Sequence, residues 1–219
     1  MDMLKTAIRN NPEDVDAALR RLGLTAAPLM RAVRAGYISR VSRTANDAPI
    51  AAGFYHWNET LRTLRDELVM LGWTRVDEQM FSTILSPDGK TAISVSSGDD
   101  ATGDPRGFPK TKRDKGPRTA DAIDANIGQL DLFDTAPEMV LATAPEDEVE
   151  CLTYVLLFHA NATELRAELS LPVSMDEHDH IDTWRERIIL RSQPIDPEGD
   201  TLPKPDFGPE IDIDVKRRA

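Results

Sequence analysis

The residues with the most specific chemistry stand together in the peptide Gln129-Leu130-Asp131-Leu132-Phe133. In an extended chain, the adjacent Leu132 and Phe133 can fill one apolar pocket of a partner, while the Gln129 amide hydrogen-bonds at its rim and fixes the register. Leu130 would cover a shallower site, and Asp131 would face solvent. Because two large apolar side chains on a loop are otherwise a solubility liability, the pattern predicts a short docking peptide.

This peptide resembles the sliding-clamp-binding motif of bacterial replication and repair proteins. In that motif a glutamine, a leucine, a small or acidic residue, a leucine and a phenylalanine occur in this order, and the resemblance covers five of the 219 positions. It implies the β sliding clamp as the partner of residues 129–133. The implied role is that of an accessory or regulatory protein, phage- or plasmid-borne or bacterial, which recruits an activity to replicating DNA or competes with the polymerase.

A structural role fits the same side chains. Leu130, Leu132 and Phe133 can anchor the preceding helix in the protein's own core, and a short apolar alternation is also typical of an edge strand. The position of the peptide between a basic loop and an acidic linker favours docking. Exposure of Leu132 and Phe133 would support that interpretation, whereas their burial against residues 152–158 would remove it.

A second candidate site is the basic stretch 110–118, which carries five basic residues and one acid. The preceding glycines follow a predicted strand, as phosphate-binding loops do, but match neither GxxxxGK[ST] nor GxGxxG. A nucleotide- or phosphate-binding protein or enzyme that uses residues 98–118 is therefore the alternative function, and a solvated loop is the structural alternative. The residues that could contact phosphate or nucleic acid are Lys110, Lys112, Arg113, Lys115 and Arg118.

Histidine and cysteine give weaker signals. His178 and His180 would share a face of an extended segment and could grip a metal ion, but no further ligand has a recognisable spacing, which favours a solvated turn. Cys151 opens an apolar strand, so we expect a buried structural thiol. His56 and Trp57 precede a predicted helix and are expected to fix its start against the core, or alternatively to line a pocket. We expect no cofactor and no metal, and no catalytic set is recognisable.

Composition limits the function classes. The chain has a hydrophobic fraction of 40%, a charged fraction of 29% and a net charge of −12, which predicts a globular protein that does not coat duplex DNA, so any nucleic-acid contact is weak or indirect. An acidic surface could also act as a decoy in a defence or counter-defence factor. No apolar stretch is long enough to cross a bilayer, and we expect a soluble cytoplasmic protein with no membrane contact. Oligomeric state is left open.

Periodicity and turn signals predict the elements of the first half of the chain. Asn11 caps a helix that Gly23 ends, and a second helix runs from Thr25. These two helices are expected to pack on each other as a hairpin. Leucines at spacings of three and four predict a third helix, with Gly72 as its stop. The turn at 86–89 predicts a hairpin. The predicted ranges are 12–22, 25–43 and 58–71 for the helices, and 80–85 and 91–96 for the strands.

The second half is predicted to be rich in strands and loops. Residues 98–118 are expected to form a long exposed loop, followed by a short helix that Gly128 stops. The whole is expected to be an α+β fold: a helical N-terminal part, then a mostly antiparallel sheet with long Pro/Gly-rich loops. The expected helix is 119–127, strands are 152–158, 187–190 and 211–215, and 165–171 is helix or strand. The expected parts are 1–72 (helical), 73–128 (hairpin, basic loop and short helix), 129–150 (docking peptide and acidic linker) and 151–219 (strand-rich).

Overall fold

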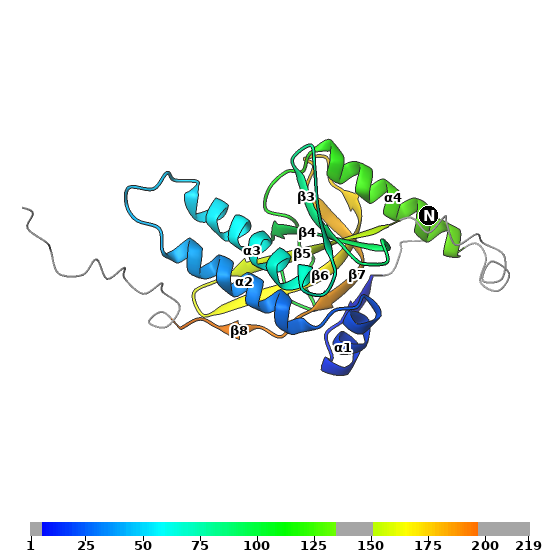
Figure 1. Ribbon diagram of the computed structural model, residues 1–219, viewed down its shortest axis with the longest axis horizontal. Coiled ribbons are helices and arrows are strands. Elements are labelled where there is room, and N and C mark those ends of the chain that lie inside the picture. The colour runs from blue at the N-terminus through cyan, green and yellow to red at the C-terminus, as the bar shows by residue number, and fades with distance from the viewer. Residues whose placement is uncertain (1–5, 135–150, 197–219) are drawn as a thin grey trace, which may run out of the picture.

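The computed structural model describes residues 6–134 and 151–196, without the side chains of residues 129–134. In these residues a mixed sheet carries helices on both faces, which confirms the predicted α+β class (Figure 1). The helices are α1 (Pro12–Arg21), α2 (Ala26–Val41), α3 (Ala51–Val69) and α4 (Pro117–Asp134). The strands are β1 (Ala7–Arg9), β2 (Thr74–Glu78), β3 (Phe81–Leu85), β4 (Thr91–Ser97), β5 (Leu152–Ala160), β6 (Glu164–Met175), β7 (Ile181–Ile189) and β8 (Gln193–Pro194).

The sheet has the strand order β1-β7-β6-β5-β4-β3-β2, and β8 pairs with β6. Two antiparallel meanders, β2-β3-β4 and β5-β6-β7, meet where β4 and β5 run parallel. A parallel pair needs a crossover connection, and α4 lies on the connection between these two strands. At the far edge, β1 pairs with β7 in parallel. The strands in residues 73–128 and those in residues 151–219, which were predicted as separate parts of the chain, thus belong to one sheet.

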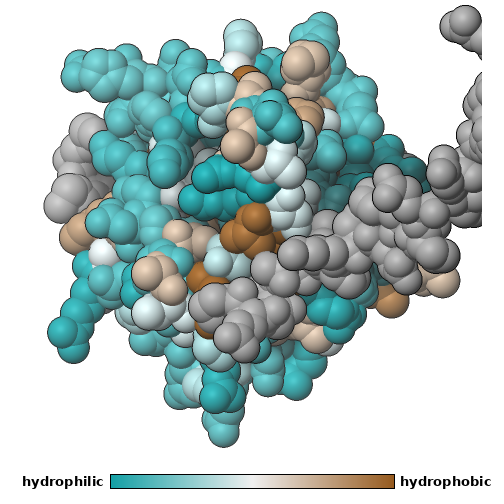
Figure 2. Space-filling model, turned by 90° about the vertical axis from the view of Figure 1, so that its left-hand side faces the viewer, coloured by the Kyte–Doolittle hydropathy of each residue, from teal (hydrophilic) through white to brown (hydrophobic). Residues whose placement is uncertain are grey.

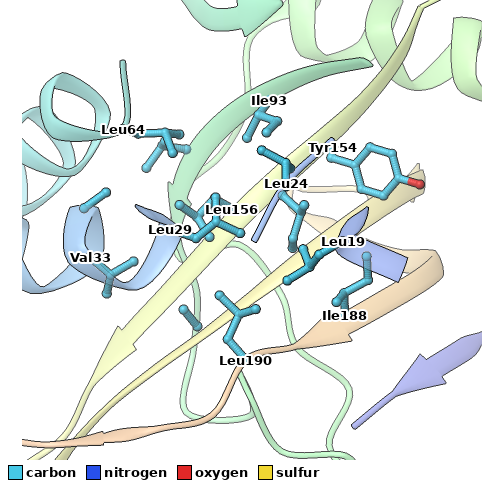
Figure 3. Packing of buried hydrophobic residues seen from close by; sticks show 14 of the residues in the cluster. Leu19, Leu24, Leu29, Val33, Leu64, Ile93, Tyr154, Leu156, Ile188 and Leu190 are labelled. Carbon is cyan, nitrogen blue, oxygen red and sulfur yellow. The ribbon is translucent and has the colours of Figure 1, made fainter. Parts of the chain in front are cut away.

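The main core lies between the sheet and helices α1, α2 and α3. Figure 3 shows Leu29 and Val33 of α2 and Leu64 of α3 gathered with Ile93 of β4 and Leu156 of β5, and none of the five side chains is exposed. Successive strand residues point to opposite faces. The neighbours of Leu156 therefore point to the other face, where they pack under α4. Each fully buried large aliphatic side chain contributes about 1.5–3 kcal/mol to folding.

The first two predicted helices are confirmed as elements, but the prediction that they pack on each other as a hairpin is wrong, because α2 packs against α3. Asn11 accepts a hydrogen bond from the backbone N–H of Glu13, as expected of an N-cap. Helices α2 and α3 lie side by side (Figure 1) and approach closely at Gly36, where a Cβ atom would lie 2.0 Å from Thr60 Oγ and 2.5 Å from the His56 carbonyl oxygen. Only glycine fits that crossing.

Helix α3 corrects the predicted start of the third helix. It begins at Ala51, seven residues earlier than the leucine spacing indicated, so His56 and Trp57 lie inside the helix and not before it. His56 is buried and its ring packs on Phe158 of β5, with 4.0 Å between the ring centroids. The early turns bury Ala51 and His56 and no leucine, which is why the leucine period did not reveal them.

The strand predictions were incomplete. The hairpin of β3 and β4 is confirmed, but the short strands β1, β2 and β8 were missed. β7 begins at Ile181, six residues before the predicted strand. The ambiguous segment 165–171 is a strand, β6, which is buried along most of its length and bulges near Pro172. A proline inside a sheet is confined to such irregularities because it lacks a donor N–H. The predicted strand 211–215 lies outside the described residues.

The surface of the described chain is mainly polar. Figure 2 looks onto the end of the molecule where α2 leads into α3, and this face is mostly hydrophilic with small separate apolar areas. Val41 at the end of α2, Ile50 before α3 and Phe54 in α3 are exposed apolar side chains. Among the described residues, no helix is long and apolar enough to cross a membrane.

Candidate functional site

The docking peptide continues the backbone of α4. This helix runs to Asp134, which corrects the predicted stop at Gly128 and the expected extended conformation of residues 129–133. Glycine ends a helix when it takes a left-handed conformation at the position after the cap, but Gly128 is not among the residues with positive φ. The side chains of Gln129, Leu130, Asp131, Leu132 and Phe133 lie outside the described set, so their exposure stays a prediction.

Helix α4 is anchored just before that peptide. Ile123 is buried on the sheet together with Val155 and Leu157. The carboxamide of Asn126 donates to the carbonyl oxygens of Thr153 (3.1 Å) and Pro172 (3.0 Å) and accepts from the Thr153 N–H at 2.8 Å. A fully buried amide with three hydrogen bonds holds the helix in one orientation on β5 and β6. The last described side chain that packs against this cluster from α4 belongs to Ile127, two positions before the docking peptide.

The segment 98–116 is a long loop, as predicted, but it is only partly exposed and is attached to the sheet. Its backbone is bonded to the strands: the N–H groups of Thr111, Lys112 and Lys115 donate to the carbonyls of Ile181, Ser97 and Asp179, each at 2.9 Å. The indole N–H of Trp184 donates to the carbonyl of Pro109 at 2.8 Å. Glycines and prolines permit the turns, and the partners that fix them come from β4 and β7 and from the turn that precedes β7.

A buried ion pair completes this attachment. Arg187 of β7 and Glu168 of β6 are 3% and 0% exposed, with 2.6 Å between Nη2 and Oε2. The guanidinium also donates to the carbonyls of Gly107 (2.7 Å) and Asp104 (3.1 Å), and the Gly103 N–H donates to Glu168 at 2.9 Å. Sheet and loop thus share one satisfied polar network, so we assign Glu168 and Arg187 a structural role.

The five basic residues of the predicted phosphate patch do not form one surface. Lys110 pairs with Asp176 (3.1 Å) and Asp182 (3.5 Å). Arg118 pairs with Glu78 (3.5 Å) and donates to Gln79 Oε1 (2.9 Å). The side chains of Lys112 and Arg113 are exposed. The fifth member of the predicted patch points inward.

That inward residue is Lys115, which lies beside a cavity on the α4 face of the sheet. Its Nζ donates to Ser96 Oγ at 2.7 Å. Burial lowers the pKa of the Lys115 ammonium to about 8, while the charge of Asp114 acts in the opposite direction. The cavity measures about 200 Å³ and is also lined by Trp57 and Phe81. A titratable group with a perturbed pKa in a cavity is a candidate for ligand binding.

The two candidate metal ligands have other roles. The Nδ1 atom of His180 lies 2.7 Å from the carbonyl oxygen of Thr111, and the side chain of His178 is exposed. The backbone N–H groups of His180 and His178 both donate to the carboxylate of Asp176. These two hydrogen bonds, of which the one from His180 has the larger effect, lower the pKa of Asp176 to about 2. The described part of the chain holds no cluster of three or more histidine, cysteine or acidic residues that could bind a metal ion.

Cys151 and the aromatic residues of α3 contribute to structure. Cys151 is half-buried, and burial raises the pKa of its thiol, which disfavours the nucleophilic thiolate. The Trp57 indole N–H donates to the Val95 carbonyl at 3.1 Å. Burial lowers the pKa of His56 to about 3, so this ring is neutral in the folded protein.

Sequence reasoning named Lys115 but missed Ser96, because the two are neighbours only through the fold. The alternation of β4 is the one available signal: Ile93 and Val95 face the main core, which places Ser94 and Ser96 on the opposite face. Searches against protein-family models, curated proteins and solved structures found no match for the chain.

Proposed function

We propose that this protein is an accessory or regulatory factor that docks onto the bacterial β sliding clamp through Gln129, Leu130, Asp131, Leu132 and Phe133. The observation that carries the proposal is the five-residue match to the clamp-binding motif. Its position adds support, because it begins directly after the residues that anchor α4 to the sheet. A peptide placed beyond the anchor can change conformation without disturbing the core.

Docking in an extended conformation requires the end of α4 to unwind. The last carbonyl groups of a helix have no partner within it, and propagation of a helix by one residue is close to neutral in free energy. Gly128 lowers the helix propensity at the junction by about 1 kcal/mol relative to alanine. Unwinding from Gly128 onward is therefore inexpensive, and Leu132 and Phe133 then become neighbours that can enter one pocket.

A binding measurement with purified bacterial β clamp tests the proposal. Titration of the labelled full-length protein should give saturable binding, and Leu132→Ala/Phe133→Ala should weaken it by more than about tenfold, since buried anchor residues carry most of the affinity of a linear motif. Met70→Ala/Leu71→Ala is a matched control, because these adjacent apolar residues end another helix and are 84% and 57% exposed. Equal binding by wild type and the Leu132/Phe133 variant would refute docking.

The same variant separates docking from a role in the protein's own core. Truncation of two buried large side chains would lower the free energy of unfolding by several kcal/mol, about 2–5 for each. If both side chains are exposed in the free protein, their truncation would lower the free energy of unfolding by less than about 1 kcal/mol in total. Urea denaturation of the Leu132→Ala/Phe133→Ala variant therefore decides between the two roles without any partner being present.

A further inference from the structure

The cavity beside Lys115 exists because two strands separate. The β3–β4 ladder ends at the pair Thr83 and Ser94, so Phe81 at the start of β3 stands apart from the last residues of β4. The Trp57 indole bonds to the Val95 carbonyl beside this gap, and both residues line the cavity. The first turn of α4 borders the cavity through Thr119. Its walls thus come from six separate elements, which are α3, β3, β4, α4, β5 and β7, together with Met80 and the segment before α4.

Lys115 brings a positive charge into this cavity without a matching negative charge. Among the described residues, no carboxylate lies within ion-pair distance of its Nζ; its one hydrogen-bond acceptor is the neutral Ser96 hydroxyl. An ammonium has three N–H donors, so two are available for another acceptor. Asp114 also lines the cavity but its side chain is exposed to solvent. Removal of an ion from water is costly unless a counter-charge replaces the water.

The rest of the lining suits a ligand with one charged end. Thr119 adds a hydroxyl group to the lining, and Trp57, Phe81, Val155 and Ile181 supply apolar surface. The hydroxyls of Ser94 and Ser96 donate to the backbone carbonyls of Tyr154 and Ser97. The N-terminus of α4 adds a partial positive charge on the same side. A volume of about 200 Å³ corresponds to roughly seven liquid water molecules, which limits the ligand to a single ring or a short chain.

We propose that the Lys115 cavity binds a small organic monocarboxylate, with the carboxylate on the Lys115 ammonium and an apolar body against Trp57 and Phe81. A single negative charge matches the one ammonium in the cavity. A phosphate monoester carries a second charge at neutral pH, which would face the carboxylate of Asp114 without a second cation in the lining. This site is independent of clamp docking.

Benzoate is the probe for this proposal, with benzamide as its neutral counterpart of the same shape. In titrations followed by the indole N–H signals in nitrogen–proton NMR spectra, benzoate should saturably shift the signal of Trp57, which Trp57→Phe identifies. Lys115→Met should weaken benzoate binding by about tenfold or more, the usual scale for loss of a charge-assisted contact. Lys90→Met, an exposed lysine at the opposite end of β4, should bind benzoate as the wild type does.

Three results would overturn the proposal. Benzoate could give no saturable shift, or Lys115→Met could bind it as tightly as the wild type, or benzamide could bind equally well, which would remove the role of charge. Phenyl phosphate that binds more tightly than benzoate would refute the carboxylate assignment. The indole signals of Trp73 and Trp184 report whether Lys115→Met retains the native fold, because both residues are buried, Trp73 just before β2 and Trp184 in β7.

Discussion

Replacement of Glu168 by alanine should unfold the protein more readily than any change to a surface ion pair. The variant removes the two carboxylate oxygens that accept from the Arg187 guanidinium at 2.6 and 2.9 Å, and it leaves the charge of a side chain that is 3% exposed. The carbonyls of Gly107 and Asp104 remain as acceptors but supply no counter-charge. The Gly103 N–H also loses its partner.

The magnitude follows from this burial. Loss of one partner of a buried pair costs about 3–5 kcal/mol, which is a large part of the roughly 5–15 kcal/mol that stabilise a typical domain. Urea denaturation followed by tryptophan fluorescence measures this loss. Glu67→Ala is the control: its partner Arg31 is 57% exposed although the two bonds are 2.8 and 2.7 Å long, and it should cost no more than about 1 kcal/mol.

Glu168→Gln keeps the shape and one oxygen acceptor, so it should retain the fold with a smaller loss of stability. In that variant the backbone amide of Gly103 should exchange its hydrogen faster than in the wild type, because its acceptor is the side chain at position 168. Equal losses for the Glu168 and Glu67 variants, or unchanged exchange at Gly103, would refute the assignment of Glu168 and Arg187 as the attachment of segment 98–116.

Three further predictions concern single residues. The pKa of His56 is lowered to about 3 by burial and by the charge of Arg40, so below about pH 6.5 the unfolded chain binds a proton at this ring that the folded protein does not bind. The contribution of His56 to stability should therefore be complete above that pH and fall toward pH 3 by on the order of 4 kcal/mol. The variant His56→Phe should flatten this part of the profile of urea midpoint against pH. Gly128 has space for a Cβ atom, so Gly128→Ala should stabilise the helical conformation at the end of α4 by about 1 kcal/mol. In the titration with purified clamp, this variant should bind about fivefold more weakly, whereas tighter binding would mean that the peptide binds as a helix. Met80 is fully exposed in a left-handed conformation with φ of 71°, so Met80→Gly should raise the free energy of unfolding by up to about 1 kcal/mol, and a loss would show that its side chain makes a stabilising contact.

Local signals in the sequence were sufficient for much of the fold. The cap at Asn11, the leucine spacing of α3 and the turn before β4 are each set by neighbours within a few residues, and all three elements are confirmed. β6 was ambiguous because a strand buried on both faces has no alternation to distinguish it from a helix. β1 was missed because a three-residue strand leaves almost no periodicity.

The site depended on partners that are distant in the chain. Segment 98–116 has the composition of a solvated loop, and its order comes from Arg187 and Trp184 on β7, which no local pattern connects to it. Ser96 and Lys115 meet because the chain returns across the α4 face of the sheet. The sequence therefore showed that residues 110–118 are basic, but it did not show that the side chain of Lys115 points inward.

The short strand β1 has a consequence for how this protein tolerates truncation. Its three residues cover the backbone of β7 from Glu186 to Ile188, and Arg9 meets Glu186 at 3.3 Å. A chain that lacked its first ten residues would present that backbone as an open edge, which is a template for addition of strands from other molecules. Such a truncated protein should self-associate at high concentration although its helices and main core remain, so the few residues before α1 protect the sheet from aggregation.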